Sequence, residues 1–412
     1  MGNFSIALSG LQANSVALNT IGNNLANLNT TAFKGQTTSF EDLFYQQIGQ
    51  SGSGDAIQLG AGTRVSGTST DFTEGTILPD SNANSADMAL AGNGFFVVQQ
   101  GGVQSLTRAG NFQLSSSGSL ITQDGQQVMG YPAVNGVVNQ NSSLAPITIP
   151  VGLNEGAQAT QNFSITTNLN SNATVTTPYS TPVTIFDSLG QSHQATVSYA
   201  KTGTNTWSYS VDLPAGDYAP GTATNNTGTL TFDTSGNLVS PTGSVNNITF
   251  STLTDGASDL SFNWNLNNSS GTPTISQLAS ASSNTANSQD GFTSGVYQKF
   301  VVDSAGVITA QFSNGRTSTV GQIAVATVAN TAGLTASGGN NFTTTAASGL
   351  ATVGVAGAGG RGTVDDGALE QSNVNISTEF SNLIVAQRAF EANSKTVTTF
   401  DTISQDVLSM VR

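Results

Sequence analysis

Cysteine is absent from this 412-residue chain, and histidine occurs only once, at position 193. Without thiols the chain forms neither disulfides nor thiolate metal sites, so packing and hydrogen bonding must stabilise it. A lone histidine also disfavours a catalytic triad or an imidazole metal site. His193 stands in the polar run Gln191–Gln194 between two strand patterns, so we expect it to be a surface turn residue. We expect no metal site and no cofactor.

Positive charge is scarce as well. Ten Lys and Arg residues stand against 24 Asp and Glu, which gives a formal net charge of -14. A nucleic-acid partner requires phosphate neutralisation by basic side chains, and the scattered basic residues of this chain do not supply it. They also form no patch for anionic lipid, and no apolar run is long enough to span a membrane. The composition therefore predicts neither nucleic-acid binding nor membrane insertion.

The N-terminal residues lack both the basic region and the continuous apolar region of a secretory signal. Ser, Thr, Asn and Gly nevertheless dominate, while Lys and Glu are few, which is typical of many extracellular bacterial surface proteins. If the chain is exported, we expect a route that uses no cleaved signal peptide.

The acidic pairs do not indicate an enzyme. Glu41-Asp42 and Asp365-Asp366 are neighbours in sequence, whereas glycoside hydrolysis needs two carboxylates brought together in a cleft. Acids close to a helix start more often interact with the helix dipole. We expect Asp365, Asp366 and Glu370 to act in this way ahead of the last helix, and we expect no enzymatic activity.

Apolar residues recur at intervals of seven near both ends of the chain, with further apolar residues at the offset positions of a coiled-coil seam. An isolated helix with one such stripe cannot bury it alone. We therefore expect residues 1–30 and 370–412 to form helices that pair as an α-helical coiled-coil core domain and then pack against other copies. The residues predicted to carry this polymerisation are Phe4, Leu11, Leu18, Ile21, Leu25, Leu28, Leu383, Phe390, Val397, Phe400 and Val407.

A second interpretation of the stripes is an intramolecular helix pair that only ties the two ends together. The faces opposite the stripes carry Asn, Gln, Ser and Thr, which add little helix propensity and no i,i+4 ion pairs. A lone pair would be marginally stable, so this favours helices that gain order when many copies pack side by side.

Between the helices, turn signals separate short strand patterns, many with period-2 alternation. The pattern predicts a mainly β, multidomain chain with two nested antiparallel β-domains outside the helical core. Residues 71–148 and 289–369 are expected to form an inner β-domain, and residues 149–288 an inserted outer β-domain. Residues 31–70 would connect helix and sheet through a short second helix near Phe40–Ile48. The Gly-rich run Gly354–Gly360 would be the return linker.

Three segments near the ends of the chain, Ile21–Lys34, Gly367–Val374 and Leu383–Lys395, closely resemble the signatures of bacterial flagellar rod and hook proteins. Gly94–Phe96 and Thr107–Phe112 are similar to the β-domain that this family shares. The residues that carry the resemblance are Asn23, Asn24, Asn27, Phe33, Lys34, Gln387 and Arg388.

Within this family the middle of the chain separates the members, and Val183–Gly190 resembles the inserted domain of hook subunits. The resemblance implies a structural subunit that polymerises into a curved, flexible tube, links rod to filament and transmits torque as a universal joint. It implies export through the flagellar type III apparatus to the extracellular hook. The implied partners are other copies, the distal rod protein, the hook cap and the hook–filament junction proteins. The alternatives are a distal-rod protein with an enlarged insertion and a non-flagellar surface adhesin.

Overall fold

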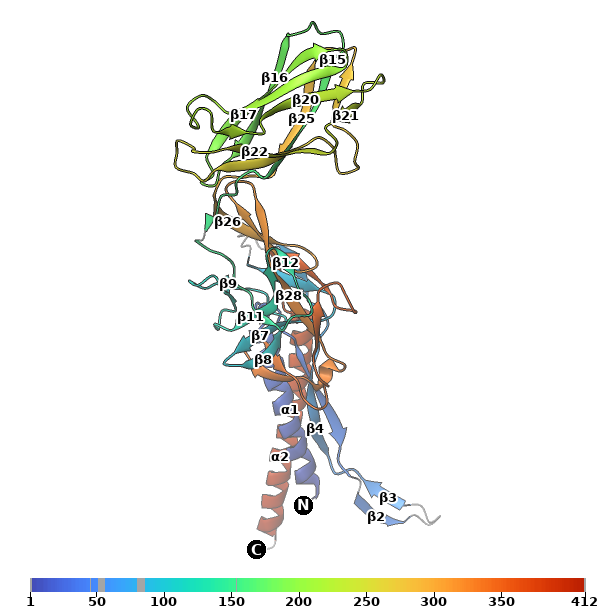
Figure 1. Cartoon of the computed structure of the whole chain (residues 1–412). Coiled ribbons are helices and arrows are strands. Elements are labelled where there is room, and N and C mark those ends of the chain that lie inside the picture. Colours follow the sequence, from blue (N-terminus) through green and yellow to red (C-terminus); the bar gives the residue numbers. More distant parts are fainter. Residues whose placement is uncertain (1, 45, 51–55, 80–85, 153, 411–412) are drawn as a thin grey trace. The chain divides into compact units, whose positions relative to one another are not determined.

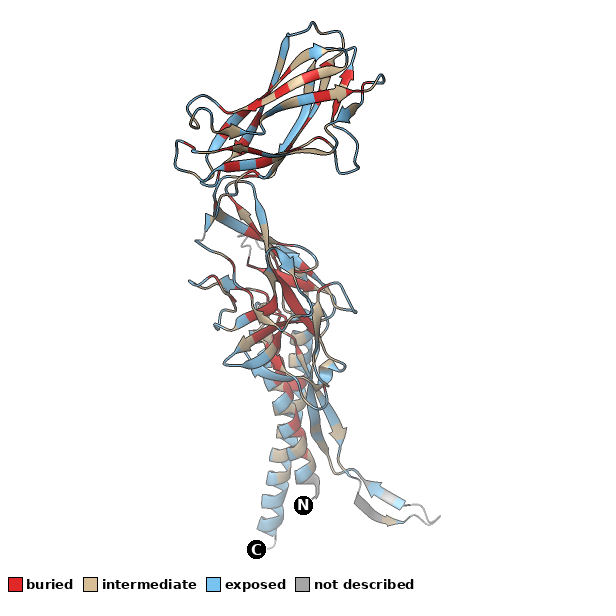
Figure 2. Ribbon diagram, viewed as in Figure 1, coloured by how far each residue is buried: buried red, intermediate tan, exposed pale blue. Residues whose placement is uncertain are grey.

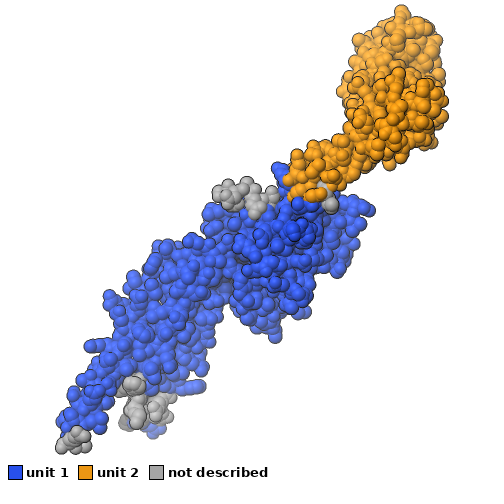
Figure 3. Space-filling view, turned by 90° about the vertical axis from the view of Figure 1, so that its left-hand side faces the viewer, with its two compact units in different colours: residues 1–151, 299–310, 317–412 blue, residues 152–298, 311–316 orange. Residues whose placement is uncertain are grey.

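The structure, a computed structural model, describes residues 2–44, 46–50, 56–79, 86–152 and 154–410. Its mainly β, multidomain architecture with one long helix near each end confirms the predicted fold class (Figure 1). Two compact units are present: unit 1 comprises residues 1–151, 299–310 and 317–412, and unit 2 comprises residues 152–298 and 311–316 (Figure 3). The four-part division predicted from the sequence is finer than this one and stays a prediction.

The predicted helix pairing is confirmed. Helix α1 (Gly2–Ala26) and helix α2 (Ile376–Met410) lie side by side and antiparallel, so that both termini come to the same end of unit 1 (Figure 1). Helix α2 begins where Asn375 accepts hydrogen bonds from the backbone N–H groups of Ser377 and Thr378, as an N-cap residue does.

Asp365, Asp366 and Glu370 do not interact with the start of the last helix, so that expectation is wrong. The two aspartates lie in β32 (Thr363–Asp366), and Glu370 ends β33 (Ala368–Glu370). The residues between Glu370 and Ile376 are not helical, because sheet pairing of β32 with β6 and of β33 with β5 continues to Glu370.

The predicted short helix near Phe40–Ile48 is also wrong. Residues 36–42 form β1 (Gln36–Asp42), which pairs antiparallel with β4 (Thr63–Thr70). The next strands, β2 (Gln46–Gln50) and β3 (Ala56–Leu59), pair with each other. The apolar residues of Phe40–Ile48 do have helical spacing. However, β4, which is rich in the β-branched residues Thr and Val, pairs with β1 through backbone hydrogen bonds, and such tertiary pairing overrides a weak local helix propensity.

Most strands of unit 1 belong to one large sheet, whose core contains Phe95, Val97, Leu106, Met129, Tyr131 and Phe342. Strands β26 and β27 contribute residues to both units. The sheet consists, among the described residues, of β7 (Phe95–Gln100), β8 (Val103–Thr107), β9 (Gln113–Leu114), β10 (Leu120–Ile121), β11 (Gln127–Val134), β12 (Val137–Val138), β13 (Ala145–Pro146), β14 (Asn154–Glu155), β26 (Gly295–Val302), β27 (Val307–Phe312), β28 (Thr317–Thr327), β29 (Thr335–Gly338), β30 (Asn341–Thr343) and β31 (Thr352–Val355). Two small pairs flank it, β32 with β6 (Met88–Ala91) and β33 with β5 (Ile77–Pro79).

The Gly-rich run Gly354–Gly360 is not a linker between the units. Its first residues belong to β31, which pairs with β28, and the rest form a turn inside unit 1. The Arg361 guanidinium donates to the carbonyl oxygens of Ala358 and Thr352, which closes this turn. The glycines serve the turn itself, since Gly357, Gly359 and Gly360 all have positive φ.

Unit 2 is a sandwich of two sheets around an aromatic core that contains Trp207, Trp264, Tyr199, Phe163 and Phe262. One sheet consists of β15 (Asn162–Asn170), β19 (Ala223–Thr224), β22 (Ser244–Phe250), β23 (Leu260–Asn265), β24 (Ile275–Leu278) and β25 (Ser283–Gln289). The other consists of β16 (Pro178–Phe186), β17 (Ser192–Gly203), β18 (Thr206–Asp212), β20 (Thr227–Phe232) and β21 (Leu238–Ser240).

The pairing in this sandwich is not entirely antiparallel. Strand β15 runs parallel to β23 and β24, and antiparallel only to β25. Parallel neighbours require a long crossover, and here residues 171–259 supply it, since they form the whole second sheet together with β19 and β22 of the first.

His193 is not the surface turn residue that the sequence predicted. It lies in β17 with 5% of its surface exposed, and its two ring nitrogens contact Asp187 and Asp217. Burial acts to lower the pKa of His193, but the hydrogen bonds to these two carboxylates outweigh it and place the pKa above its ordinary value. A local pattern does not reveal this burial, because Asp217 comes from another loop and only Asp187 lies in the turn before β17.

Candidate assembly surface

Small residues lie on the buried side of α1. In α1 the buried side is formed by Ala7, Gly10, Ala13 and Ala17, spaced three or four apart. A Cβ atom on Gly10 would lie 2.8 Å from Nδ2 of Asn393 in α2. Gly10 therefore lies directly against the Asn393 side chain, and a larger residue at this position would require that side chain to move.

The predicted heptad residues divide into several groups. Ile21 is buried, and most of the others are half-buried; these are Leu11, Leu18, Leu25, Leu28, Leu383, Val397 and Phe400. Phe390 and Val407 are exposed by 37% and 54%. The side chain of Phe4 lies outside the described residues. The spacing thus located the two helices, but it largely missed the small residues on the buried side of α1, although their three-to-four spacing was a usable signal.

Both helices leave large apolar side chains exposed, most of them on α2. Figure 2 shows the C-terminal half of this helix as an exposed surface, and every residue from 401 to 410 is exposed. A lone soluble helix pair has no reason to carry so many. The exposed apolar residues of the pair, here called the helix-pair surface, are Leu8, Val16, Ile376, Phe380, Ile384, Val385, Phe390, Ile403, Val407, Leu408 and Met410.

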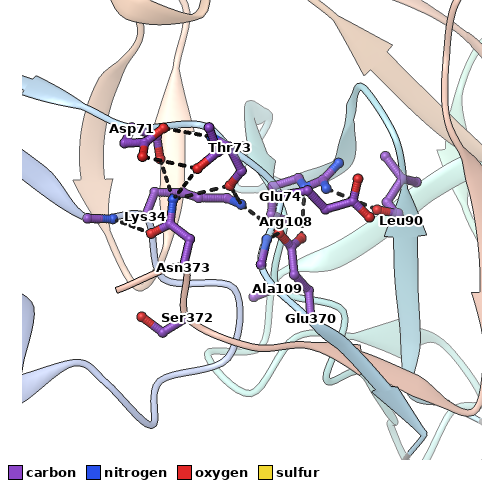
Figure 4. Close-up of polar contacts among 12 residues, drawn as sticks. Lys34, Asp71, Thr73, Glu74, Leu90, Arg108, Ala109, Glu370, Ser372 and Asn373 are labelled. Atoms are coloured by element: carbon purple, nitrogen blue, oxygen red, sulfur yellow. Dashed lines mark hydrogen bonds and ion pairs between the residues drawn. The ribbon is translucent and has the colours of Figure 1, made fainter. Parts of the chain in front are cut away.

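A buried ion cluster joins the two terminal segments close to the helices, and Figure 4 shows it with its polar neighbours. Oε1 of Glu370 accepts hydrogen bonds from Lys34 Nζ at 2.5 Å and from the Gly75 N–H at 2.8 Å. Oε2 of Glu370 accepts from Arg108 Nε at 2.9 Å. Lys34, Arg108 and Glu370 have exposed fractions of 3%, 4% and 0%, so the cluster is shielded from water.

The remaining donors of the cluster are paired with backbone oxygens. Lys34 Nζ donates to the carbonyl of Thr73, and the Arg108 guanidinium donates to the carbonyls of Gly92, Gly94 and Leu90. Burial lowers the pKa of Lys34 below its ordinary value, although the hydrogen bond to Glu370 acts in the opposite direction. The cluster thus ties the loop after α1 to the strand that precedes α2.

Two asparagines hold the backbone beside this cluster. Asn24 pairs with the N–H and the carbonyl of Gln36, at 2.9 Å and 2.8 Å. Asn373 accepts from the Gly35 N–H at 2.8 Å and donates to the carbonyl of Asp71. Side chains from the two ends of the chain therefore fix two adjacent residues, Asn24 holding Gln36 and Asn373 holding Gly35.

The signature residues consequently have two kinds of environment. Asn24 and Lys34 are buried, Phe33 is half-buried, and Asn27 donates to the Asn23 carbonyl at the end of α1. Asn23, Gln387 and Arg388 are exposed, and Arg388 forms a surface pair with Glu391. Sequence reasoning missed the structural role of Arg108, Glu370 and Asn373, because each finds its partners far away in the chain.

Four family descriptions match this chain. Residues 4–34 match "Flagella basal body rod protein", and residues 365–410 match "Flagellar basal body rod FlgEFG protein C-terminal". Residues 89–168 match "Flagellar hook protein FlgE/F/G D1 domain", and residues 157–292 match "Flagellar basal body protein FlaE D2 domain".

Full-length relatives extend the similarity from end to end. The chain is 36% identical to the flagellar hook protein FlgE of Salmonella typhimurium, and the match covers 99% of both chains. It is 35% identical to FlgE of Escherichia coli over the same shares, and 31% identical to FlgE of Treponema pallidum over 98% of each. A crystal structure of Helicobacter pylori FlgE2 shares the fold, with a TM-score of 0.53 and 17% identity over 71% of this chain and 100% of the other. In the part of the chain that the structure describes, neither helix is long and apolar enough to cross a membrane.

Proposed function

This chain belongs to the flagellar hook protein family and is a structural subunit of the hook, and from this premise we propose that it polymerises with its own copies through the helix-pair surface. The polymer would be a curved, flexible tube that links rod to filament and transmits motor torque as a universal joint. The observation that carries the proposal is the apolar surface that the paired helices leave exposed.

Burial of this surface would supply much of the assembly energy. Each buried Leu, Ile, Val, Phe or Met side chain contributes roughly 1.5–3 kcal/mol. A contact between different surfaces of identical subunits produces a helical polymer when its rotation does not close into a ring. In this proposal the predicted polymerisation residues have two roles. Ile21, Leu383, Val397 and Phe400 hold the two helices together, and Phe390 and Val407 contact neighbouring copies.

Unit 2 suits a tube that bends while it rotates. Its outward strand positions carry mostly Ser, Thr and Asn, as in β15, β17 and β25, and its apolar residues are sequestered in the aromatic core. Polar, hydrated contacts exchange more readily than dry apolar ones. In a bent, rotating tube each row of subunits along its length must extend and contract once per turn. With polar contacts between neighbouring copies of unit 2, this change would need little energy.

The finer parts of the assignment follow from family membership. We propose the distal rod protein, the hook cap and the hook–filament junction proteins as neighbours, and export by the flagellar type III apparatus to the extracellular hook without a cleaved signal peptide. The absence of cysteine suits a chain that travels unfolded, because no disulfide has to be reduced. The match of residues 157–292 to the FlaE D2 family favours a hook subunit over a rod subunit or an adhesin.

The proposal is tested in a strain from which this gene is deleted, without a plasmid and with a plasmid that carries the wild-type gene or a variant. Electron microscopy of basal bodies should show complete rods without hooks in the deletion, and hooks again with the wild-type copy. A copy with Ile384→Ser, Val407→Ser and Leu408→Ser should not restore hooks, although the protein folds and is exported. Val137→Ser, on a side chain that is 70% exposed in unit 1 outside the helices, is the control and should restore them. Normal hooks from the triple variant would contradict assembly through the helix-pair surface.

A further inference from the structure

His193 is surrounded by carboxylates that come from three separate loops of unit 2. Asp187 follows β16, Asp217 follows β18, and Asp255 lies between β22 and β23. The ligand atoms of Asp187, His193 and Asp255 all lie within 4.8 Å of one another. We propose that these three residues bind a divalent transition-metal ion, with Zn²⁺ as the best fit, and that Asp217 orients the imidazole.

The distances suit such an ion. Nε2 of His193 lies 3.1 Å from Oδ2 of Asp187 and 3.7 Å from Oδ2 of Asp255. In a tetrahedral zinc site with bonds of about 2.0–2.1 Å, two ligand atoms are separated by about 3.3 Å. The two observed separations lie on either side of this value, so small side-chain rotations would complete the geometry.

Each carboxylate is positioned by one oxygen and leaves the other for the site. Oδ1 of Asp187 accepts from the N–H groups of Leu189 and Gln191, and its Oδ2 points to the imidazole. Oδ1 of Asp255 accepts from the Ala257 N–H, and its Oδ2 also approaches the imidazole. Because one oxygen of each carboxylate is held by backbone N–H groups, the other oxygen is preorganised as a ligand atom.

The turn that Asp187 forms recurs at two other aspartates of the chain. Asp233 and Asp303 each accept from the N–H groups two and four residues later through Oδ1, as Asp187 does. Neither of them faces a histidine, because the chain has only one. The turn therefore accounts for Oδ1 of Asp187, while its Oδ2 faces the imidazole of His193, as a ligand atom must.

The fourth residue completes the pattern of a ligating histidine. Nδ1 of His193 lies 2.9 Å from Oδ2 of Asp217, which leaves Nε2 as the ligand atom. Metal-bound histidines almost always donate their second ring N–H to a carboxylate, a carbonyl or water. The Asp217 loop is tied to the Asp255 loop, since the Thr254 N–H donates to the Asp217 carbonyl at 3.0 Å and Thr254 Oγ1 donates to the Gly216 carbonyl.

The donor set selects the class of metal. One imidazole nitrogen with two carboxylate oxygens suits Zn²⁺ better than Ca²⁺ or Mg²⁺, which take oxygen ligands alone. Asp187 is fully buried, whereas the Asp255 side chain is 28% exposed. The ion can therefore enter past Asp255, and water can fill the remaining coordination position.

The test measures Zn²⁺ binding to the purified full-length chain after treatment with a chelator. Isothermal titration should show one Zn²⁺ per chain, and added Zn²⁺ should raise the melting temperature of unit 2. A tenfold excess of Ca²⁺ should not displace it. His193→Gln should abolish binding, and Asp217→Asn should weaken it roughly 10–100-fold, as expected for the loss of a carboxylate that orients a ligand.

Two further variants keep the result interpretable. Asp255→Asn leaves the buried pair of His193 and Asp187 intact and should fold normally, yet it should weaken Zn²⁺ binding at least tenfold. Asp233→Asn alters a matched turn without a histidine and should bind as the wild type does. Tryptophan fluorescence in chelator establishes that each variant is folded before metal is added. Equal Zn²⁺ affinity in the wild type and Asp255→Asn, equal weakening in Asp233→Asn, or displacement by Ca²⁺ would overturn the proposal.

Discussion

The carboxylate of Glu370 holds two cations that are remote from it in sequence. Lys34 is 336 residues away and Arg108 is 262 residues away, and both meet Glu370 in a region closed to water. Removal of one partner from a buried ion cluster leaves an uncompensated charge, which is far more costly than the loss of a surface pair. At the residue scale, this carboxylate thus connects the two terminal signature segments.

Glu370→Gln should destabilise unit 1 by about 3 kcal/mol, because two buried cations lose their counter-charge. The measurement is chemical denaturation of the monomeric chain. Glu41→Gln is the matched control, since Glu41 pairs with Arg64 at the surface and its loss should cost less than about 1 kcal/mol. If the two substitutions lowered the free energy of unfolding equally, the buried cluster would stabilise unit 1 no more than a surface ion pair does.

Asp290 should make unit 2 sensitive to acid. Burial acts to raise its pKa, but hydrogen bonds from the N–H groups of Gln161 and Asn162 and from the Asn162 side chain outweigh it and hold the pKa below its ordinary value. A depressed folded-state pKa gives stability that is present above the unfolded pKa and lost as the pH falls through the folded pKa.

Asp290→Asn should therefore lower the melting temperature at pH 7, by an amount that corresponds to roughly 1 kcal/mol. As the pH falls below the ordinary pKa of an aspartate and through its lower folded-state pKa, the difference from the wild type should shrink, because the wild-type carboxyl then also becomes protonated. Paired thermal scans from pH 7 to pH 2.5 check this. A difference that stays constant over the range would mean that the carboxylate charge is unimportant.

At the scale of elements, the terminal helices combine a tight contact with an exposed apolar surface. Small residues in α1 allow the close approach, and the larger apolar residues of both helices remain half-buried or exposed. Heptad spacing predicted the helices and their pairing because it is a local property of the chain. It did not predict which side faces the partner helix, because that choice depends on the small residues between the heptad positions.

Gly10→Leu should separate the two helices even though leucine is a much better helix former than glycine. We expect a lower melting temperature of the helical signal at 222 nm, since the new side chain would collide with Asn393. Gly22→Ala is the control, because a Cβ atom added at this position of α1 would have no other atom within 4 Å, and it should stabilise the helix by up to about 1 kcal/mol. A rise in melting temperature for both variants would contradict the tight contact.

At the scale of the whole molecule, assembly and folding are separable. Among the residues that the structure describes, the apolar cluster around Phe95 in the large sheet and the core of unit 2 contain no residue of α1, so their packing does not depend on that helix. The helix-pair surface, in contrast, requires both helices.

A chain without residues 1–28 should remain soluble, with folded β-structure, and should form no tubes. Circular dichroism and tryptophan fluorescence report the folding of the sandwich, because Trp207 and Trp264 both lie in its core. Negative-stain electron microscopy then reports polymerisation under conditions in which the full-length chain assembles. Normal tubes from the truncated chain would show that α1 is dispensable.

The sequence by itself determined the helical ends, the β-rich middle and the family, because periodicity and signature segments are properties of neighbouring residues. Only the tertiary structure decided the roles of Glu370, His193 and the run Gly354–Gly360. Local composition suggested a helix-dipole partner, a surface turn residue and a linker, whereas long-range pairing made them a buried counter-ion, the centre of a carboxylate cluster and a strand with its turn. The physical reason is the same in each case: the deciding partners come from distant parts of the chain, and only folding brings them together.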